Sequence, residues 1–554
     1  TFTTTGDKLV YFTLQWGGQT GIEKITVIAK ANGMVSSEII ELDVRNPNPP
    51  ILTTKNKLLN AGEEVDLPYV LENNYNGNWL KLEASRIPFV DISRRLDFIF
   101  TYAHYCSEQL ISTAFPLLYA LQLDKNTQDA EKIKKHVNES ISQLYARQLT
   151  NGGFSFWPGQ QQVNTWVTSY AGNFLIIAKE KGYEVNQTVI NKWIAYQRKA
   201  AKEWKATSQR GNNYMYDQED FEQAYRLYTL AMANAAEMGA MNRLKERKDL
   251  SIQAKWRLAA AYAICGKTKI GNDMVFNVTK TINPYSSKNT TFGSSDRDEA
   301  MILEAMILLG KLNDAFQQAK KVSENLRNES TFSTQSTAYA LIAMGCFAEK
   351  MAGNLQFDWT VNGVNQETVK TANVMFTKSL KPYPLKGSVH IKNRGTKSIY
   401  VSLISKTVPF VDNRPSINHK LKVEVMYTSM DGKKIDVAKL KQGTDFMAII
   451  RIYNTDVTQD YTNLALTHIL PSGWEILNER MLQPEIGNAY TYQDIRDDRV
   501  LTYFDLQRGK SIVVKVRLQA TYCGSFLLPA ILCEPMYHAN AQARTAAGRV
   551  MVVK

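Results

Sequence analysis

Residues 102–120 read YAHYCSEQLISTAFPLLYA, and the run CSEQ (106–109) at their centre is the starting point for the fold and the function. A cysteine and a glutamine three residues apart at the start of a helix are expected to share one face. If the Cys106 thiolate attacks the Gln109 carbonyl and ammonia leaves, an internal thioester forms, which survives only where water is kept away. The spacing alone favours a simpler interpretation, a capping box in which Gln109 reaches back to a backbone N–H.

This run opens a long region, from about residue 93 to residue 351, that has helical periodicity. Apolar residues recur every three or four positions, and small residues such as Ala259 and Ala338 lie on the apolar faces, which predicts close helix packing. Recurring helix hairpins are typical of a layered α/α array or a closed α/α toroid. The candidate helices span residues 107–123, 165–181, 221–238, 251–265, 298–309 and 334–347.

Strand patterns flank the helical region on both sides. An Asn-Gly pair at 32–33 predicts a hairpin, and the run RNPNPP (45–50) predicts a linker because proline lacks the N–H that a central strand needs. Residues 51 to about 92 again resemble short strands, and the last 140 or so residues predict a β-sandwich. The clearest strands are expected at residues 9–14, 22–31, 36–44, 357–361, 388–392, 398–405, 421–427, 446–453, 464–470, 500–506 and 511–518.

Composition excludes several classes of protein. The chain has 554 residues and a net charge of +13, but its Lys and Arg are scattered, so we expect no nucleic-acid groove. No apolar run reaches the roughly 18 residues that cross a bilayer. The six histidines fit no H-E-x-x-H pattern and the five cysteines no C-x-x-C pair, so we expect neither a metal nor another cofactor. Sequence alone leaves open whether Cys523 and Cys533 form a disulfide.

The chain resembles the bacterial α2-macroglobulin branch of the family of thioester-containing proteins that includes complement. The family pattern C-x-E-Q is matched by Cys106, Glu108 and Gln109, and it is followed by the run FPLLY (115–119). The other similarities are collinear and extend from about residue 10 to the end. They are GGFSFWPG (152–159), TWVTSYAGNFL (165–175), FGSSDRDEAMILEA (292–305), STQSTAYALIAM (333–344), LPSGWE (470–475), IRDDRV (495–500), LPA (528–530) and CEPMYHANAQART (533–545).

The resemblance implies a multidomain α+β fold, in which macroglobulin-like and CUB-like β-sandwiches flank an α/α-toroid thioester domain. The chain would then be the C-terminal part of a longer protein, which agrees with its start at Thr1 inside a strand-like pattern. The implied domains are the C-terminal part of a macroglobulin-like sandwich at 1–50, a CUB-like domain in two segments at 51–92 and 353–413, the toroid at 93–352, and a C-terminal macroglobulin-like sandwich at 414–554.

The resemblance also implies a function, a broad-spectrum endopeptidase inhibitor that is used once and is not an enzyme. A protease would cut a bait segment, the protein would rearrange, and the exposed thioester between Cys106 and Gln109, with Glu108 as support, would tether the attacker. The partners would be proteases, held covalently or caged. The location would be the periplasm or cell envelope, with the membrane reached only through an N-terminal anchor outside this chain.

Shielding of the bond is expected from aromatic and thioether side chains, which are apolar. The resemblance indicates Met536 and Tyr537 on the C-terminal side, with Tyr102 and Tyr105 on the other side. One departure from the family concerns this second side. Where members usually have P-Y-G before the cysteine, this chain has Ala-His-Tyr (103–105), so Tyr105 replaces a glycine and loses its access to positive φ.

Two other interpretations remain open at this point. In the first, the protein is a thioester-free envelope scaffold or binding module of the same fold. In the second, it is a toroid enzyme that acts on glycans with two carboxylates. The acids for the second would be Asp296, Asp298 and Glu299, although acids at a helix start are also explained by the positive end of the helix dipole.

Overall fold

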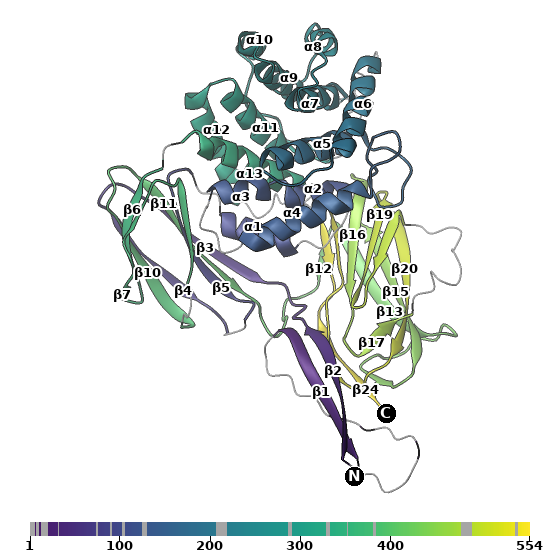
Figure 1. The fold of residues 1–554 in the computed structure, drawn as a ribbon. Coiled ribbons are helices and arrows are strands. Elements are labelled where there is room, and N and C mark those ends of the chain that lie inside the picture. Colours follow the sequence, from purple (N-terminus) through teal and green to yellow (C-terminus); the bar gives the residue numbers. More distant parts are fainter. Residues whose placement is uncertain are drawn as a thin grey trace.

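The structure is a computed structural model that describes residues 6, 10, 12, 20–31, 33–73, 76–88, 91–101, 106–123, 130–205, 219–285, 291–327, 333–351, 353–380, 384–477, 490–537 and 541–554. Helices form one body, and two β-sandwiches lie beneath it on opposite sides (Figure 1). A hairpin of two strands points away from the helices, toward the end where both termini lie. The helical body therefore contacts strands that come both before and after it in the chain.

The hairpin joins β1 (Gly21–Ala31) to β2 (Met34–Val44) in antiparallel register. Ala31 pairs with Met34 across the predicted Asn-Gly turn, and Gly33 there has a φ of 79°. The RNPNPP segment has no strand, as predicted, and the buried Asn48 amide donates hydrogen bonds to the carbonyls of Pro409 and Phe410. The strand expected at 9–14 falls largely outside the described residues.

One sandwich is assembled from strands on both sides of the helical region. The middle strand β11 pairs with β3 and β5, so that Val401 lies opposite both Lys57 and Ala84. The two sheets have the orders β3-β11-β5-β9 and β4-β10-β6-β7, with β8 beside β6. This split sandwich therefore combines strands from residues 51–85 with strands from residues 355–407. Its strands are β3 (Ile51–Leu59), β4 (Glu64–Val70), β5 (Trp79–Ser85), β6 (Leu355–Val361), β7 (Val364–Asn365), β8 (Val369–Thr371), β9 (Met375–Ser379), β10 (Lys386–Asn393) and β11 (Ile399–Thr407).

The helices occupy the chain between β5 and β6 and share one large apolar core. Neighbouring helices in sequence pack against each other, as in α9 with α10 and α11 with α12, which is the pattern of an α/α toroid. They are α1 (Ile92–Thr101), α2 (Ser107–Ala114), α3 (Leu117–Leu123), α4 (Ala130–Tyr145), α5 (Thr165–Glu180), α6 (Gln187–Glu203), α7 (Glu219–Met232), α8 (Met238–Lys245), α9 (Ile252–Ile264), α10 (Thr268–Met274), α11 (Ser295–Leu308), α12 (Leu312–Arg327) and α13 (Thr334–Glu349).

Two expected helices are each shorter than the periodicity indicated. The helix predicted over 107–123 is two helices, because Pro116 has no N–H to continue the ladder and begins a new turn instead. The helix predicted over 221–238 ends at Met232, where Asn234 adopts a φ of 54° and closes the helix end. In both cases the apolar periodicity continues across a break that local backbone chemistry imposes.

The second sandwich follows β11 and has its own core. Its sheets have the orders β12-β23-β22-β16-β19-β18, β13-β15-β20-β17 and β14-β24-β21. In Figure 1 the upper ends of β16 and β19 lie against the helical body. The strands are β12 (Ile417–His419), β13 (Leu421–Ser429), β14 (Lys439–Lys441), β15 (Asp445–Asn454), β16 (Tyr461–Ile469), β17 (Trp474–Ile476), β18 (Tyr492–Ile495), β19 (Arg499–Leu506), β20 (Ser511–Ala520), β21 (Gly524–Leu528), β22 (Leu532–Pro535), β23 (Gln542–Arg544) and β24 (Gly548–Val553).

The cysteines form no disulfide in the structure. Cys523 is exposed and donates its S–H to Gln442, whereas Cys533 is buried in the sandwich core, so the pair left open above is not bonded. Cys265 and Cys346 are half-buried against the helical core. Within the described residues, no helix has the length and hydropathy needed to cross a membrane.

Close approach between α5 and α6 fixes this part of the toroid. The indole of Trp193 lies over Gly172, where an added Cβ would come within 2.0 Å of the ring, and its N–H donates to the Thr168 carbonyl at 2.7 Å. Because Trp193 is almost fully buried, the ring has no room to retreat. A glycine is therefore needed at position 172 for packing.

We expect Gly172→Ala to destabilise the protein by about 1–3 kcal/mol through overpacking. The matched control is Gly239→Ala on α8, where the nearest atom to an added Cβ is the flexible end of Arg243 at 3.6 Å. That substitution should be neutral or stabilise by up to about 1 kcal/mol, because alanine favours helix. The measurement is the thermal unfolding midpoint of both variants. Equal midpoints for Gly172→Ala and Gly239→Ala would contradict the proposed overpacking at Gly172.

Candidate functional site

The CSEQ run lies at the N-terminus of α2, and the whole of this helix is buried. Cys106 is the N-cap residue, and its sulfur accepts a hydrogen bond from the Gln109 N–H at 3.4 Å. The Gln109 carboxamide points toward the C-terminal sandwich, with its nitrogen 3.1 Å from the Met536 sulfur. Cys106 thus makes the N-cap half of a capping box, whereas the Gln109 amide nitrogen is directed to Met536. The structure brings Cys106 and Gln109 onto one turn.

A turn directly after β22 in the C-terminal sandwich covers this end of α2. It carries Met536 and Tyr537, both buried, and the Tyr537 hydroxyl lies 3.5 Å from the Cys106 sulfur. The Met536 N–H donates to the carbonyl of Asn463 in β16, which anchors the turn to its own sheet. The structure places both residues over the CSEQ turn.

Aromatic rings surround the contact between the two domains. Trp157 stacks on Tyr492 with a centroid distance of 4.5 Å, and Phe292 lies 5.2 Å from Tyr537. Together these rings and their aliphatic neighbours form a separate apolar cluster, the interdomain cluster, which excludes water from Cys106. Its members are Cys106, Phe156, Trp157, Phe292, Ala465, Tyr492, Leu501, Tyr503, Met536 and Tyr537.

Burial keeps the Cys106 thiol protonated. The pKa of this thiol is raised to about 12, mainly because the group is removed from water and in part because Glu108 is nearby, although the hydrogen bonds with Tyr537 and Gln109 oppose the rise. The thiolate is the reactive form of cysteine, so the group is a poor free nucleophile as it stands. An electrophile built on this sulfur would be equally sheltered.

Glu108 is buried on the toroid side of the same turn. Its carboxyl accepts hydrogen bonds from Ser112 at 2.5 Å, Thr334 at 3.3 Å and Gln335 at 3.4 Å. Burial raises the pKa of this carboxyl to about 7, against hydrogen bonds from Ser112 and Tyr537, among others, which lower it. Both protonation states are therefore accessible near neutral pH.

The remaining predicted shielding residues, Tyr102 and Tyr105, lie outside the described residues, as do His104 and His538. Trp157, Phe292 and Tyr503 also belong to the enclosure, and they were not predicted from the sequence. Two of these residues fall within motifs quoted above, GGFSFWPG and FGSSDRDEAMILEA, and an aromatic residue in a glycine-rich loop was the available signal. These three residues come together only where the two domains dock, and no local sequence pattern indicates that docking.

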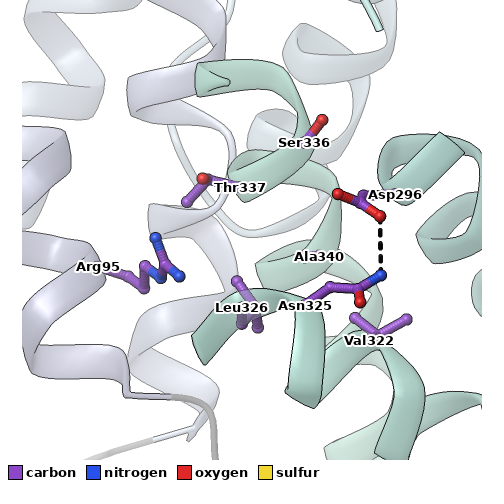
Figure 2. Close-up of a pocket in the computed structure, with 8 residues that line it drawn as sticks. All are labelled: Arg95, Asp296, Val322, Asn325, Leu326, Ser336, Thr337 and Ala340. Carbon is purple, nitrogen blue, oxygen red and sulfur yellow. Dashed lines mark hydrogen bonds between the residues drawn. The ribbon is translucent and has the colours of Figure 1, made fainter. Parts of the chain in front are cut away.

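The acids proposed for a glycan enzyme are engaged in structural contacts. The buried Asp298 pairs with Arg297 at 2.6 Å, and Glu299 pairs with Lys321 at 2.7 Å. Asp296 accepts a hydrogen bond from Asn325 at the edge of a pocket between α1, α11, α12 and α13 (Figure 2). These contacts do not resemble an acid and base facing a substrate. Among the described residues, no cluster of three or more His, Cys, Asp or Glu is placed to hold a metal ion.

Two family models match the chain. The A-macroglobulin TED domain matches residues 93–367, and the bacterial alpha-2-macroglobulin MG10 domain matches residues 421–540. Between them they account for the toroid and the C-terminal sandwich. Both partners in the contact around Cys106 therefore belong to named domains of one family.

Relatives and solved structures agree with these models. The alpha-2-macroglobulin of Pasteurella multocida is 23% identical over 93% of this chain, which spans only 28% of that protein. Native Escherichia coli alpha-2-macroglobulin from domain MG7 to the C-terminus matches with a TM-score of 0.80 and 20% identity, over 96% of this chain and 88% of that one.

A second solved structure, Salmonella alpha-2-macroglobulin reacted with methylamine, also has a TM-score of 0.80, at 21% identity. It covers 97% of this chain and 36% of that one. The fold, the two domain models and the curated relatives agree. The chain belongs to the bacterial alpha-2-macroglobulin family, and it corresponds to the C-terminal part of such a protein.

Proposed function

We propose that Cys106 and Gln109 join in an internal thioester that arms a protease inhibitor. The observation that carries this proposal is the placement of both side chains on one buried turn, sealed by Met536 and Tyr537 from another domain. An acyl–sulfur bond hydrolyses when wet, so a dry enclosure around a Cys and a Gln serves this chemistry better than it serves a helix cap.

The inhibitor would act once and would not be an enzyme. Cleavage of a bait segment outside this chain would separate the C-terminal sandwich from the toroid and uncover the bond. An amine of the attacking endopeptidase would then take the Gln109 acyl group, leaving a new amide and a free Cys106 thiol. Because this route needs only an amine and an exposed thioester, it suits proteases of many kinds, held covalently or caged.

The domain assignment supports this mechanism. We assign residues 1–50 to the C-terminal part of a macroglobulin-like sandwich, 51–92 and 353–413 to the two segments of a CUB-like domain, 93–352 to the thioester toroid and 414–554 to the C-terminal macroglobulin-like sandwich. The split sandwich connects directly to α1 and α13, so its movement would pull on both ends of the toroid. By analogy with the family, the protein would work in the periplasm or cell envelope.

A thioester-free scaffold or binding module of the same fold is the second candidate. The observation that favours it is the capping hydrogen bond at Cys106, since a cap explains a cysteine at that position without any covalent chemistry. In the inhibitor the Cys106 sulfur would form a covalent acyl bond, whereas in the scaffold it would only cap the helix. Intact-mass and protease-capture experiments distinguish the two functions.

We expect the intact wild-type protein to weigh one ammonia less than its sequence. Methylamine should add to Gln109 and release one thiol at Cys106, because aminolysis of a thioester forms an amide and a thiol. Intact-mass spectrometry with and without methylamine, followed by peptide mapping, provides the measurement.

Two variants control this measurement. Cys106→Ala should have its full sequence mass and take up no methylamine. Cys346→Ala, which removes a half-buried thiol on α13, should behave as wild type. Wild-type protein of full mass that is inert to methylamine would contradict the thioester.

We expect Met536→Ala to accelerate the reaction with methylamine at least about tenfold. Truncation of a buried methionine costs roughly 2–5 kcal/mol, and every ~1.4 kcal/mol that weakens the docked state increases exposure of the bond tenfold. Thiol release is followed with a chromogenic reagent. Met306→Ala on α11, in the toroid core away from the interdomain cluster, is the control, and equal acceleration in both variants would refute shielding by Met536.

We expect wild-type protein to form complexes with an attacking protease that survive boiling in detergent, whereas Cys106→Ala forms none. A protease with dimethylated lysines, which keeps its activity but has blocked amines, should be captured far less by wild type. Gel analysis and mass mapping of the Gln109 crosslink provide the readout. Capture that is unchanged by Cys106→Ala would favour the scaffold.

A further inference from the structure

We propose that the Tyr537 hydroxyl relays the thiol proton of Cys106 to Glu108 while the thioester forms. This inference depends on the proposed thioester and concerns how that bond is made. Tyr537 would be a catalytic residue, because its hydroxyl touches the reacting sulfur, and Glu108 would be a positioning residue that acts through Tyr537. The C-terminal sandwich would then supply part of the machinery that builds the bond it later shields.

Ring closure at this turn needs a base and an acid. Sulfur attacks as a thiolate, yet burial raises the pKa of Cys106 to about 12, so almost no thiolate exists at neutral pH. The amide nitrogen of Gln109 is also a poor leaving group until it receives a proton. A group that takes the thiol proton and returns it to the nitrogen would lower both barriers.

The contacts place such a relay at the turn. The Tyr537 hydroxyl lies 3.5 Å from the Cys106 sulfur, and it also interacts with the Glu108 carboxyl, whose pKa it lowers. Met536, the residue before Tyr537, holds the Gln109 nitrogen at 3.1 Å from its sulfur. One two-residue turn of the C-terminal sandwich therefore contacts the nucleophile, the leaving group and the carboxyl.

Protons and bonds balance in this route. The Cys106 S–H proton passes to the Tyr537 oxygen as the Tyr537 proton passes to the Glu108 carboxylate, and the bond from sulfur to the Gln109 carbonyl carbon forms. Glu108 then returns its proton to the Tyr537 oxygen, and Tyr537 gives a proton to the Gln109 nitrogen. The carbon–nitrogen bond breaks, and ammonia leaves. Tyr537 and Glu108 end as they began, and no oxidant or reductant is required.

The environment of Glu108 suits a carboxyl that accepts a proton and then releases it. Burial raises its pKa to about 7, so its two protonation states are close in free energy at neutral pH. Ser112 and Gln335 hold the carboxyl from the toroid side. One consequence is that the thioester forms only after the two domains have docked, so the bond is never made before it is protected.

The test follows the mass of newly synthesised protein over time. Tyr537→Phe keeps the ring and the shield but loses the hydroxyl, so we expect loss of ammonia to slow by at least about 100-fold, the scale of general acid–base catalysis. Tyr492→Phe removes another hydroxyl from the interdomain cluster and should match wild type. Tyr537→Phe that closes at the wild-type rate would overturn the relay.

A pair of substitutions at Glu108 provides an independent test if Tyr537→Phe does not fold. Glu108→Gln keeps the shape and hydrogen-bonding capacity but cannot accept a proton, whereas Glu108→Asp keeps the carboxyl on a shorter side chain. A proton-relay role predicts faster closure in the Asp variant, and a purely structural role predicts faster closure in the Gln variant, which would overturn the proposal. Wild-type protein that never loses ammonia would refute the thioester itself, a distinct result.

Discussion

The contact between the 536–537 turn and the start of α2 is the interaction on which the rest of the site depends. It joins residues more than 400 positions apart, Cys106 and Tyr537, across two domains that each have their own core. Few side chains make this contact, yet they exclude water from the whole turn. A displacement of the sandwich by the width of one water molecule would wet the site, so the state of the domain interface and the reactivity of the turn are coupled.

The toroid supports this turn through a buried polar network. Ser112 links Glu108 to Tyr170, whose ring stacks on Tyr339 at 5.3 Å, and the Tyr339 hydroxyl meets that of Tyr225. Polar groups in a core are costly unless they are satisfied, and once satisfied they favour one arrangement over others. The network therefore fixes α2 relative to α5, α7 and α13, while the interdomain side of the same turn rests on the apolar interdomain cluster and on a few polar contacts from Met536 and Tyr537.

This asymmetry matches what a switch needs. A network of hydrogen bonds holds the turn in the toroid, whereas the shield is held by the interdomain cluster and two contacts from Met536 and Tyr537, so separation of the domains would leave α2 in place while the 536–537 turn moves away. The aromatic rings of Trp157 and Tyr492 stack across the interface without any ion pair between them. Separation of these two rings leaves no unpaired charge behind, which keeps the cost of parting them moderate.

The sequence allowed the order of β, α and β regions to be predicted, because periodicity and turn residues are local signals. It did not reveal the break at Pro116 inside an unbroken apolar pattern, or the end of α7 at Met232. The pairing of Cys106 with Gln109 followed from helical spacing, whereas Met536 and Tyr537 became candidates only through the family resemblance. Trp157 and Tyr503 were not predicted, since their meeting depends on the register of β19 and the docking of two domains.

Burial at this site has opposite effects on the two forms that Cys106 can take. As a free thiol it is held protonated and unreactive, because a thiolate would be unsolvated beside Glu108. As an acyl donor it would be protected by the same dryness, since water is the competing nucleophile. A wet site would favour the thiolate but destroy the thioester, and a dry site preserves the thioester but needs help to form it. Contacts from Tyr537 to both Cys106 and Glu108 resolve this conflict, because they supply proton transfer where solvent cannot.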